Sequence, residues 1–102
     1  MNRRRPPREL APDPEAWPDG HLTDPGAAAV QDVARTLAQI LRERGLSLRR
    51  IAEISGVNRQ AIADLLEGRS WPDIATVARL GDALAVPLWP TGRLEETGIE
   101  RK

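Results

Sequence analysis

Residues 48–67 constrain the fold most, because they predict two short helices separated by only three residues. Gly56 lies between the helices, where the chain must turn sharply and a larger residue would often be strained. Ala52 is small enough to let the second helix cross closely over the first. Apolar and small residues share one face of a helix over about 48–55 and one face of a helix over about 59–67; these residues are Leu48, Ile51, Ala52, Ser55, Ile62, Leu65 and Leu66. The segment therefore predicts two helices held at a fixed angle by a tight turn.

Two further helices flank this pair. Apolar residues repeat at helical spacing over about 25–44 and over about 74–85, and Pro87 prevents the last helix from continuing. Each predicted helix is preceded by a residue whose side chain can accept a hydrogen bond from its first turn; these predicted N-caps are Asp24, Ser47, Asn58 and Asp73. No alternation typical of strands occurs. The expected fold is therefore all-α.

The two ends of the chain differ from its middle. Residues 1–24 hold five of the nine prolines and show no sustained periodicity, so we expect a disordered or extended Pro/Arg-rich extension there. The sequence leaves open whether this extension folds back onto the helices, in which case Trp17 would pin it. Residues 25–88 form the expected domain, and residues 89–102 a C-terminal tail.

The composition excludes several classes of function. A chain of 102 residues with 40% hydrophobic residues can build one small domain with a modest core. It has no cysteine, which excludes disulfides, thiolate metal sites and cysteine nucleophiles. No apolar run approaches the ~18 residues of a membrane span, so we expect a cytoplasmic protein. His21 is the single histidine and has no partner nucleophile or ligand cluster. We therefore expect no enzymatic activity, no metal and no cofactor.

Charge is unevenly distributed along the chain. The 15 basic and 15 acidic residues cancel, which by itself argues against nucleic-acid binding. Residues 27–69, however, hold seven arginines and five acidic residues, so their net charge is 7 − 5 = +2. The distribution matters more than the sum for binding to phosphates, so the neutral total does not exclude DNA.

The stretch from Leu41 to Leu88 resembles the phage-repressor (Cro/XRE) type of helix-turn-helix DNA-binding domain. Five elements carry the resemblance in order: Arg-Gly-Leu-Ser, Ile-Ala-x-x-x-Gly-Val, Ile-x-x-Leu, Gly-x-x-x-Pro and Leu-Gly-Asp-Ala-Leu-Ala-Val. The resemblance covers about half of the chain. It implies a compact bundle of four to five helices that contains a helix-turn-helix and reads bases with its third helix. Pro87 and Pro90 interrupt the region of the family's fifth helix.

Carried over by position, the resemblance implies that Arg59, Gln60 and Asp64 contact bases. Helical geometry supports this assignment, because placing Ile62 inward puts Gln60 and Asp64 within about 20° of the opposite face. Arginine can pair with guanine and glutamine with adenine, each worth about 1–3 kcal/mol of discrimination. Asp64 could accept a hydrogen bond from cytosine N4 or hold Arg59, and the sequence does not decide between these roles.

Phosphate contacts are expected around the same two helices, from Ser47, Arg49, Arg50, Asn58 and Arg69. Arg49 and Arg50 occupy the first turn of a helix, where positive charge opposes the helix dipole. DNA phosphates would offset that cost; the alternative is ordinary solvated charge. The basic start Arg3-Arg4-Arg5, with Arg8, is either a solvated segment or an arm for the minor groove.

These observations favour a sequence-specific DNA-binding transcriptional regulator. Its expected partner is double-stranded DNA, bound as a homodimer that forms weakly or only on DNA. Leu88 and Trp89 are expected to close the end of the core; the alternative is that they form a dimer contact. The competing hypothesis is an antitoxin-like or adaptor protein that uses the same bundle mainly to bind another protein. Asp64 and Glu67 favour this competitor, because their carboxylates lie on the side that would face DNA.

Overall fold

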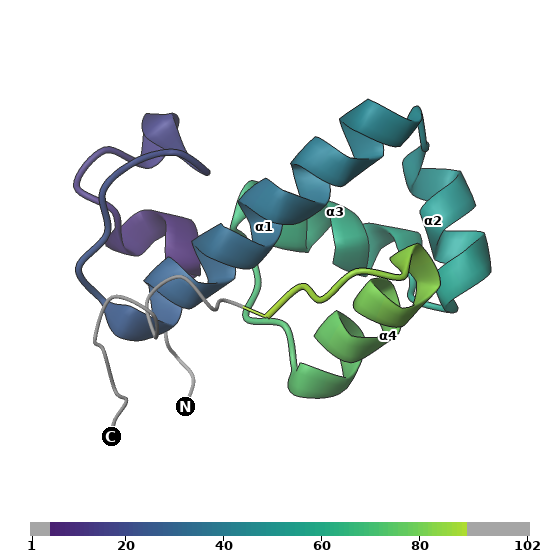
Figure 1. Cartoon of the computed structure of the whole chain (residues 1–102). Helices are drawn as coiled ribbons and strands as arrows, with labels where there is room; N and C mark the ends of the chain where they lie inside the picture. The colour runs from purple at the N-terminus through teal and green to yellow at the C-terminus, as the bar shows by residue number, and fades with distance from the viewer. Residues whose placement is uncertain (1–4, 90–102) are drawn as a thin grey trace, which may run out of the picture.

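The computed structural model describes residues 5–89, which form four α-helices and two short 3-10 helices. The 3-10 helices η1 (Pro7–Leu10) and η2 (Pro14–Ala16) come first, and the α-helices follow (Figure 1); these are α1 (Pro25–Arg44), α2 (Leu48–Ser55), α3 (Arg59–Glu67) and α4 (Ile74–Leu84). The expected all-α bundle is confirmed. The last helix ends one residue before its predicted end, at Leu84, because Ala85 adopts a left-handed conformation with φ 59°.

Every predicted N-cap lies where the sequence places it. Asp24 accepts a hydrogen bond from Ala27 N (2.8 Å) and Ser47 from Arg50 N (3.0 Å). Asp73 likewise accepts from Thr76 N at 2.7 Å. These bonds satisfy backbone donors that a helix leaves without an internal partner in its first turn. Local sequence therefore sets where each helix begins.

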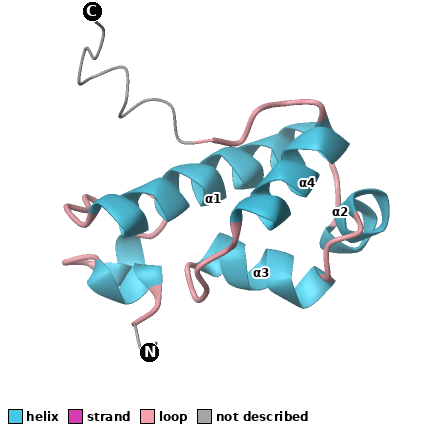
Figure 2. Ribbon diagram, turned by 90° about the horizontal axis from the view of Figure 1, so that it is seen from below, coloured by secondary structure: helices cyan, strands magenta, loops and turns pink. Residues whose placement is uncertain are grey.

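The core lies where the helices meet. Helix α1 contacts η1 and α3, and α2 contacts both α3 and α4. The largest side chains that are under 2% exposed come from all four α-helices, and each contributes about 1.5–3 kcal/mol by its burial; they include Leu37, Ile51, Ile62, Leu65, Leu80 and Leu84. Leu88 is also buried, at 2% exposure, and closes the end of the core as expected, whereas Trp89 is 44% exposed. This packing holds α3 against both α1 and α2, and Figure 2 shows α3 along one edge of the bundle.

The N-terminal segment, residues 5–24, is folded onto the helices. The expectation of a disordered or extended extension is therefore wrong for these residues, and the open possibility that Trp17 pins them is what the structure shows. Trp17 is 8% exposed and Leu22 is 6% exposed, and the Trp17 indole Nε1 donates to the Leu66 carbonyl at 2.9 Å. Prolines prevent a long helix here but permit short 3-10 turns, whose apolar side chains find a partner surface on α1 and α3.

The ends of the chain, residues 1–4 and 90–102, lie outside the described residues. Arg3, Arg4, Pro90 and most of the expected tail belong to them. Within residues 5–89, no helix is both long and apolar enough to cross a membrane.

Candidate nucleic-acid interface

The turn between α2 and α3 determines how α3 is presented. Gly56 has φ 77° and its N–H donates to the Ala52 carbonyl at 2.9 Å. The Ser55 hydroxyl oxygen then accepts from Val57 N at 3.1 Å, and Val57 is only 7% exposed. Positive φ is strained for residues with a side chain, so a glycine suits this position. The turn thus holds the second helix of the pair at a defined angle, as the sequence predicts.

Helix α3 is amphipathic across its whole length. Ile62 and Leu65 are 0% exposed and face the bundle, whereas Arg59 and Gln60 are exposed. At its start, the Asn58 side-chain oxygen accepts from Gln60 N (2.7 Å) and Ala61 N (3.2 Å). The helix therefore presents a polar outer face on a rigid base.

Asp64 is the centre of a hydrogen-bonded cluster on this outer face. Gln60 Nε2 donates to Asp64 Oδ1 at 3.0 Å. Arg69 donates to the same oxygen through Nε at 3.2 Å and Nη2 at 3.0 Å. The hydrogen bond from Gln60, followed by that from Arg69, lowers the pKa of the Asp64 carboxyl. The alternative that Asp64 holds Arg59 is wrong, because its partners are Gln60 and Arg69.

The cluster continues to the N-terminal segment through Glu67. Arg69 Nη1 lies 3.9 Å from Glu67 Oε1, and Arg8 Nη1 lies 3.1 Å from the same oxygen. Arg8 also joins the backbone of α3's end, since its N–H donates to the Gly68 carbonyl at 3.0 Å. The two carboxylates on the outer side of α3 are therefore each paired with arginine, which reduces the negative charge that they would show to DNA.

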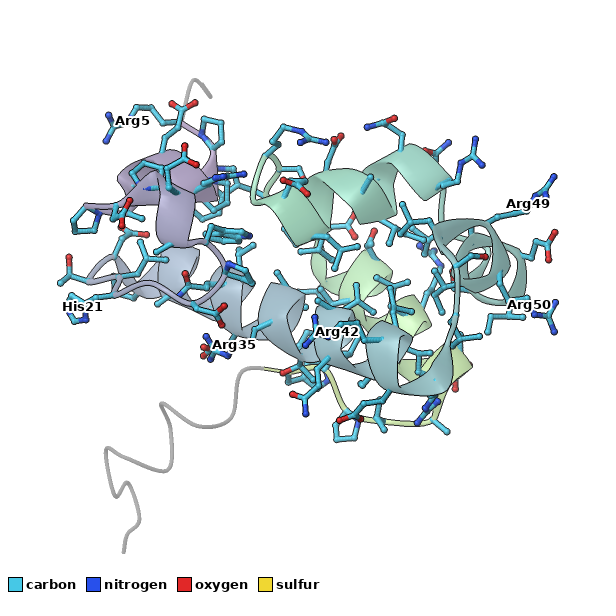
Figure 3. The ribbon with its side chains drawn as sticks, turned by 90° about the horizontal axis from the view of Figure 1, so that it is seen from above. Arg5, His21, Arg35, Arg42, Arg49 and Arg50 are labelled. Atoms are coloured by element: carbon cyan, nitrogen blue, oxygen red, sulfur yellow. The ribbon has the colours of Figure 1, made fainter. Side chains whose placement is uncertain are left out.

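Two arginines lie outside this cluster, Arg49 in the first turn of α2 and Arg59 at the start of α3. Within residues 5–89, no hydrogen bond or ion pair involves the side chain of Arg49 or Arg59. Arg50 pairs with Glu53 at 3.4 Å, and both side chains stay more than half exposed. Figure 3 shows Arg49 and Arg50 pointing outward from α2, at the opposite end of the molecule from Arg5.

The remaining predicted site residues are placed as follows. Ser47 and Asn58 are exposed caps at the N-termini of α2 and α3. The Arg5 carbonyl accepts from Trp71 Nε1 at 2.8 Å, which ties Arg5 to the bundle. His21 lies at the N-terminal end of the molecule with Arg5 (Figure 3). Among the described residues, no group of three or more His, Cys, Asp or Glu could hold a metal ion.

Sequence reasoning did not identify the contacts that Arg8 and Trp17 make with α3. Arg8 and Trp17 both bond to carbonyls at its C-terminal end, from 59 and 49 residues away in the chain. Neither belongs to a periodic pattern, and so no signal in the sequence indicates their target.

Comparison with known proteins shows which family the helix-turn-helix segment matches. A family model described as helix-turn-helix matches residues 37–88, half of the chain, and the chain belongs to this family. The resemblance to the phage-repressor (Cro/XRE) type is thereby confirmed.

A particular relative is the HTH-type transcriptional regulator SutR of Escherichia coli (strain K12). The two are 34% identical over 55 residues, which cover 54% of this chain and 31% of SutR. The chain thus matches about a third of the relative's length.

Proposed function

We propose that the chain is a sequence-specific DNA-binding transcriptional regulator that inserts α3 into the major groove of double-stranded DNA. The observation that carries the proposal is the outer face of α3, where Arg59 has no side-chain partner within residues 5–89 and lies beside the hydrogen-bonded pair of Gln60 and Asp64. The major groove is about 12 Å wide and admits one helix. Arg59 matches guanine O6 and N7, and Gln60 matches adenine N6 and N7. Asp64 is the third proposed member of this base-facing set.

Phosphate contacts come from the ends of α2 and α3. Arg49 and Arg50 begin α2 and so oppose its dipole, a cost that nearby phosphates offset. Helix N-termini attract phosphate. We therefore expect Ser47 and Asn58, which cap the N-termini of α2 and α3, to contact phosphates as well. Arg69, which follows the C-terminal end of α3, is the last of the proposed phosphate contacts. These contacts orient α3 without reading sequence.

In this proposal residues 25–88 are the DNA-binding domain and a homodimer is the bound form. A dimer places two α3 helices in successive turns of one duplex, about 34 Å apart. The name of SutR, a transcriptional regulator, supports the regulatory role. The arm formed by Arg3, Arg4 and Arg5 would extend the contact surface beyond α3.

The decisive experiment is selection of bound sequences from a random DNA pool, repeated at several salt concentrations. We expect one enriched motif and an affinity that falls steeply with salt, because phosphate contacts release counterions. Absence of any motif, together with no binding at low salt, would overturn the proposal in favour of a protein-binding adaptor or antitoxin-like role.

Single substitutions then distinguish side chains that contact bases from side chains that contact phosphates. Arg59→Ala and Gln60→Ala should each relax preference at particular base pairs, whereas Arg49→Ala and Arg50→Ala should weaken all sequences alike. Arg42→Ala is the matched control, because it removes an exposed arginine from α1 (Figure 3). Equal, sequence-independent losses from all four variants would show that α3 does not read bases.

A further inference from the structure

We infer that Asp64 is a positioning residue that orients the carboxamide of Gln60 and thereby makes it select adenine. The inference rests on the proposed function, because it requires Gln60 to contact a base. The two residues are four positions apart on α3, a spacing that places their side chains on the same face of a helix. Their contact, Gln60 Nε2 to Asp64 Oδ1 at 3.0 Å, lies on the outer face itself.

The chemistry of the contact fixes which end of the carboxamide is the donor. An ionised carboxylate only accepts hydrogen bonds, whereas a carboxamide carries two N–H donors on one side and an oxygen acceptor on the other. Rotating the Gln60 amide by half a turn would bring its oxygen against the carboxylate. Such a pair repels, so Asp64 permits one orientation.

That orientation leaves an adjacent donor and acceptor on Gln60. One N–H is bound to Asp64, while the second N–H and Oε1 form a pair that matches adenine N7 and the adenine N6 amino group. Guanine presents two acceptors, N7 and O6, at the same positions. The fixed oxygen of Gln60 would oppose guanine O6, so the oriented amide discriminates between the two purines.

Asp64 is itself held in place from its other side. Arg69 donates to Oδ1 through two nitrogens, and its guanidinium lies between Asp64 and Glu67. Glu67 is in turn paired with Arg8 of the N-terminal segment. The carboxylate therefore has a fixed position from which to orient Gln60, and the lowered pKa of Asp64 keeps it ionised near neutral pH.

The test compares Asp64→Asn with wild type and Gln60→Ala on the selected site and on its variants at the base pair that Gln60 reads. An asparagine at position 64 has nearly the same shape but can present either oxygen or nitrogen, so it no longer fixes the amide. We expect Asp64→Asn to reduce the adenine-over-guanine preference at that base pair by about fivefold or more. Combining it with Gln60→Ala should cause no further loss there.

Glu43→Gln is the matched control, because it removes the carboxylate of a similar pair on α1, in which Gln39 Nε2 donates to Glu43 Oε2 at 3.0 Å, without touching the residues that hold Asp64. It should leave the adenine preference unchanged. Loss of a cytosine preference at another base pair in Asp64→Asn would overturn the inference and assign Asp64 to direct reading of cytosine N4. An unchanged purine preference would also overturn it. A wild type that selects no motif would instead show that the proposed function itself has failed.

A second measurement on the free protein does not depend on DNA. In wild type the Gln60 side-chain N–H resonances should be displaced from those of a solvated glutamine, and in Asp64→Asn they should move toward the solvated positions. Identical Gln60 resonances in the two proteins would overturn the inference. Unfolding midpoints of Asp64→Asn and Glu43→Gln that equal the wild-type midpoint show that neither change acts through the fold.

Discussion

Gly68 combines two structural requirements in one residue. It ends α3 with φ 73°, a conformation that residues with a side chain rarely adopt. A Cβ at this position would also lie 2.6 Å from Cε2 of Trp17 and 2.8 Å from Cβ of Arg8. The first requirement follows from the helix, and the second arises only because the N-terminal segment packs against its end.

Gly68→Ala and Gly45→Ala separate these two requirements. Gly45 has φ 65° but open space where a Cβ would lie, so its substitution should cost about 1–2 kcal/mol from the backbone alone. Gly68→Ala should cost at least about 1 kcal/mol more, because the buried indole must move. Urea unfolding measures both free energies. Equal losses would show that Trp17 does not pack on this glycine in solution.

Asp73, the N-cap of α4, should make the free energy of unfolding depend on pH. Hydrogen bonds from Thr76 lower the pKa of this carboxyl, so the folded protein binds its proton more weakly than the unfolded chain does. The stabilisation by the charged cap is then complete above the unfolded pKa of about 3.9 and is lost as pH falls through the lower native pKa. Asp73→Asn keeps a neutral cap at every pH. Its deficit against wild type should therefore shrink below about pH 4 in urea titrations, and a deficit that grows on acidification would contradict this sign.

At the scale of elements, the start of α3 links stability to DNA binding. Asn58 accepts from two backbone N–H groups of the first turn. Asn58→Ala removes both bonds and should cost about 1 kcal/mol of unfolding free energy. Asn58→Asp keeps the cap and should fold about as stably as wild type. It adds a negative charge where we propose a phosphate contact, so its DNA affinity should fall while its urea midpoint does not. Unchanged affinity for Asn58→Asp would place the phosphate elsewhere.

At the scale of the whole molecule, the N-terminal segment supports the C-terminal end of α3. Trp17 and Arg8 bond to carbonyls of residues 66–68, which a helix leaves without internal partners at its end. Hydrogen bonds to Gly20 and Pro18 carbonyls, from Gln31 and Arg35, tie the same segment to α1. The helix proposed to read DNA is thus capped by the turn at one end and by the N-terminal segment at the other.

Substitutions of Trp17 test whether the N-terminal segment supports the C-terminal end of α3. Trp17→Ala should cost about 3–5 kcal/mol, because it removes a buried aromatic side chain and its hydrogen bond. Trp17→Phe removes mainly the hydrogen bond to Leu66 and should cost nearer to about 1 kcal/mol. Hydrogen exchange at the Arg8 amide, which donates to Gly68, should accelerate in the alanine variant. A small loss for Trp17→Ala, with Arg8 exchange unchanged, would show that the segment contributes nothing to the fold.

Local sequence is enough to predict the helices and the turn, because caps, glycines and apolar spacing act within a few residues of one another. Asp24, Ser47, Asn58 and Asp73 form the bonds that their positions predict. The spacing of Ile62 and Leu65 likewise predicts which face of α3 is buried.

The partners of the exposed polar residues and the course of the N-terminal segment depend instead on how the helices pack. The link from Asp64 through Arg69 and Glu67 to Arg8 joins residues whose side chains have many alternative partners in the sequence. Trp17 and Leu22 are buried although no periodic pattern surrounds them. Such contacts depend on surfaces that exist only after the helices have packed, and local spacing therefore carries no signal for them.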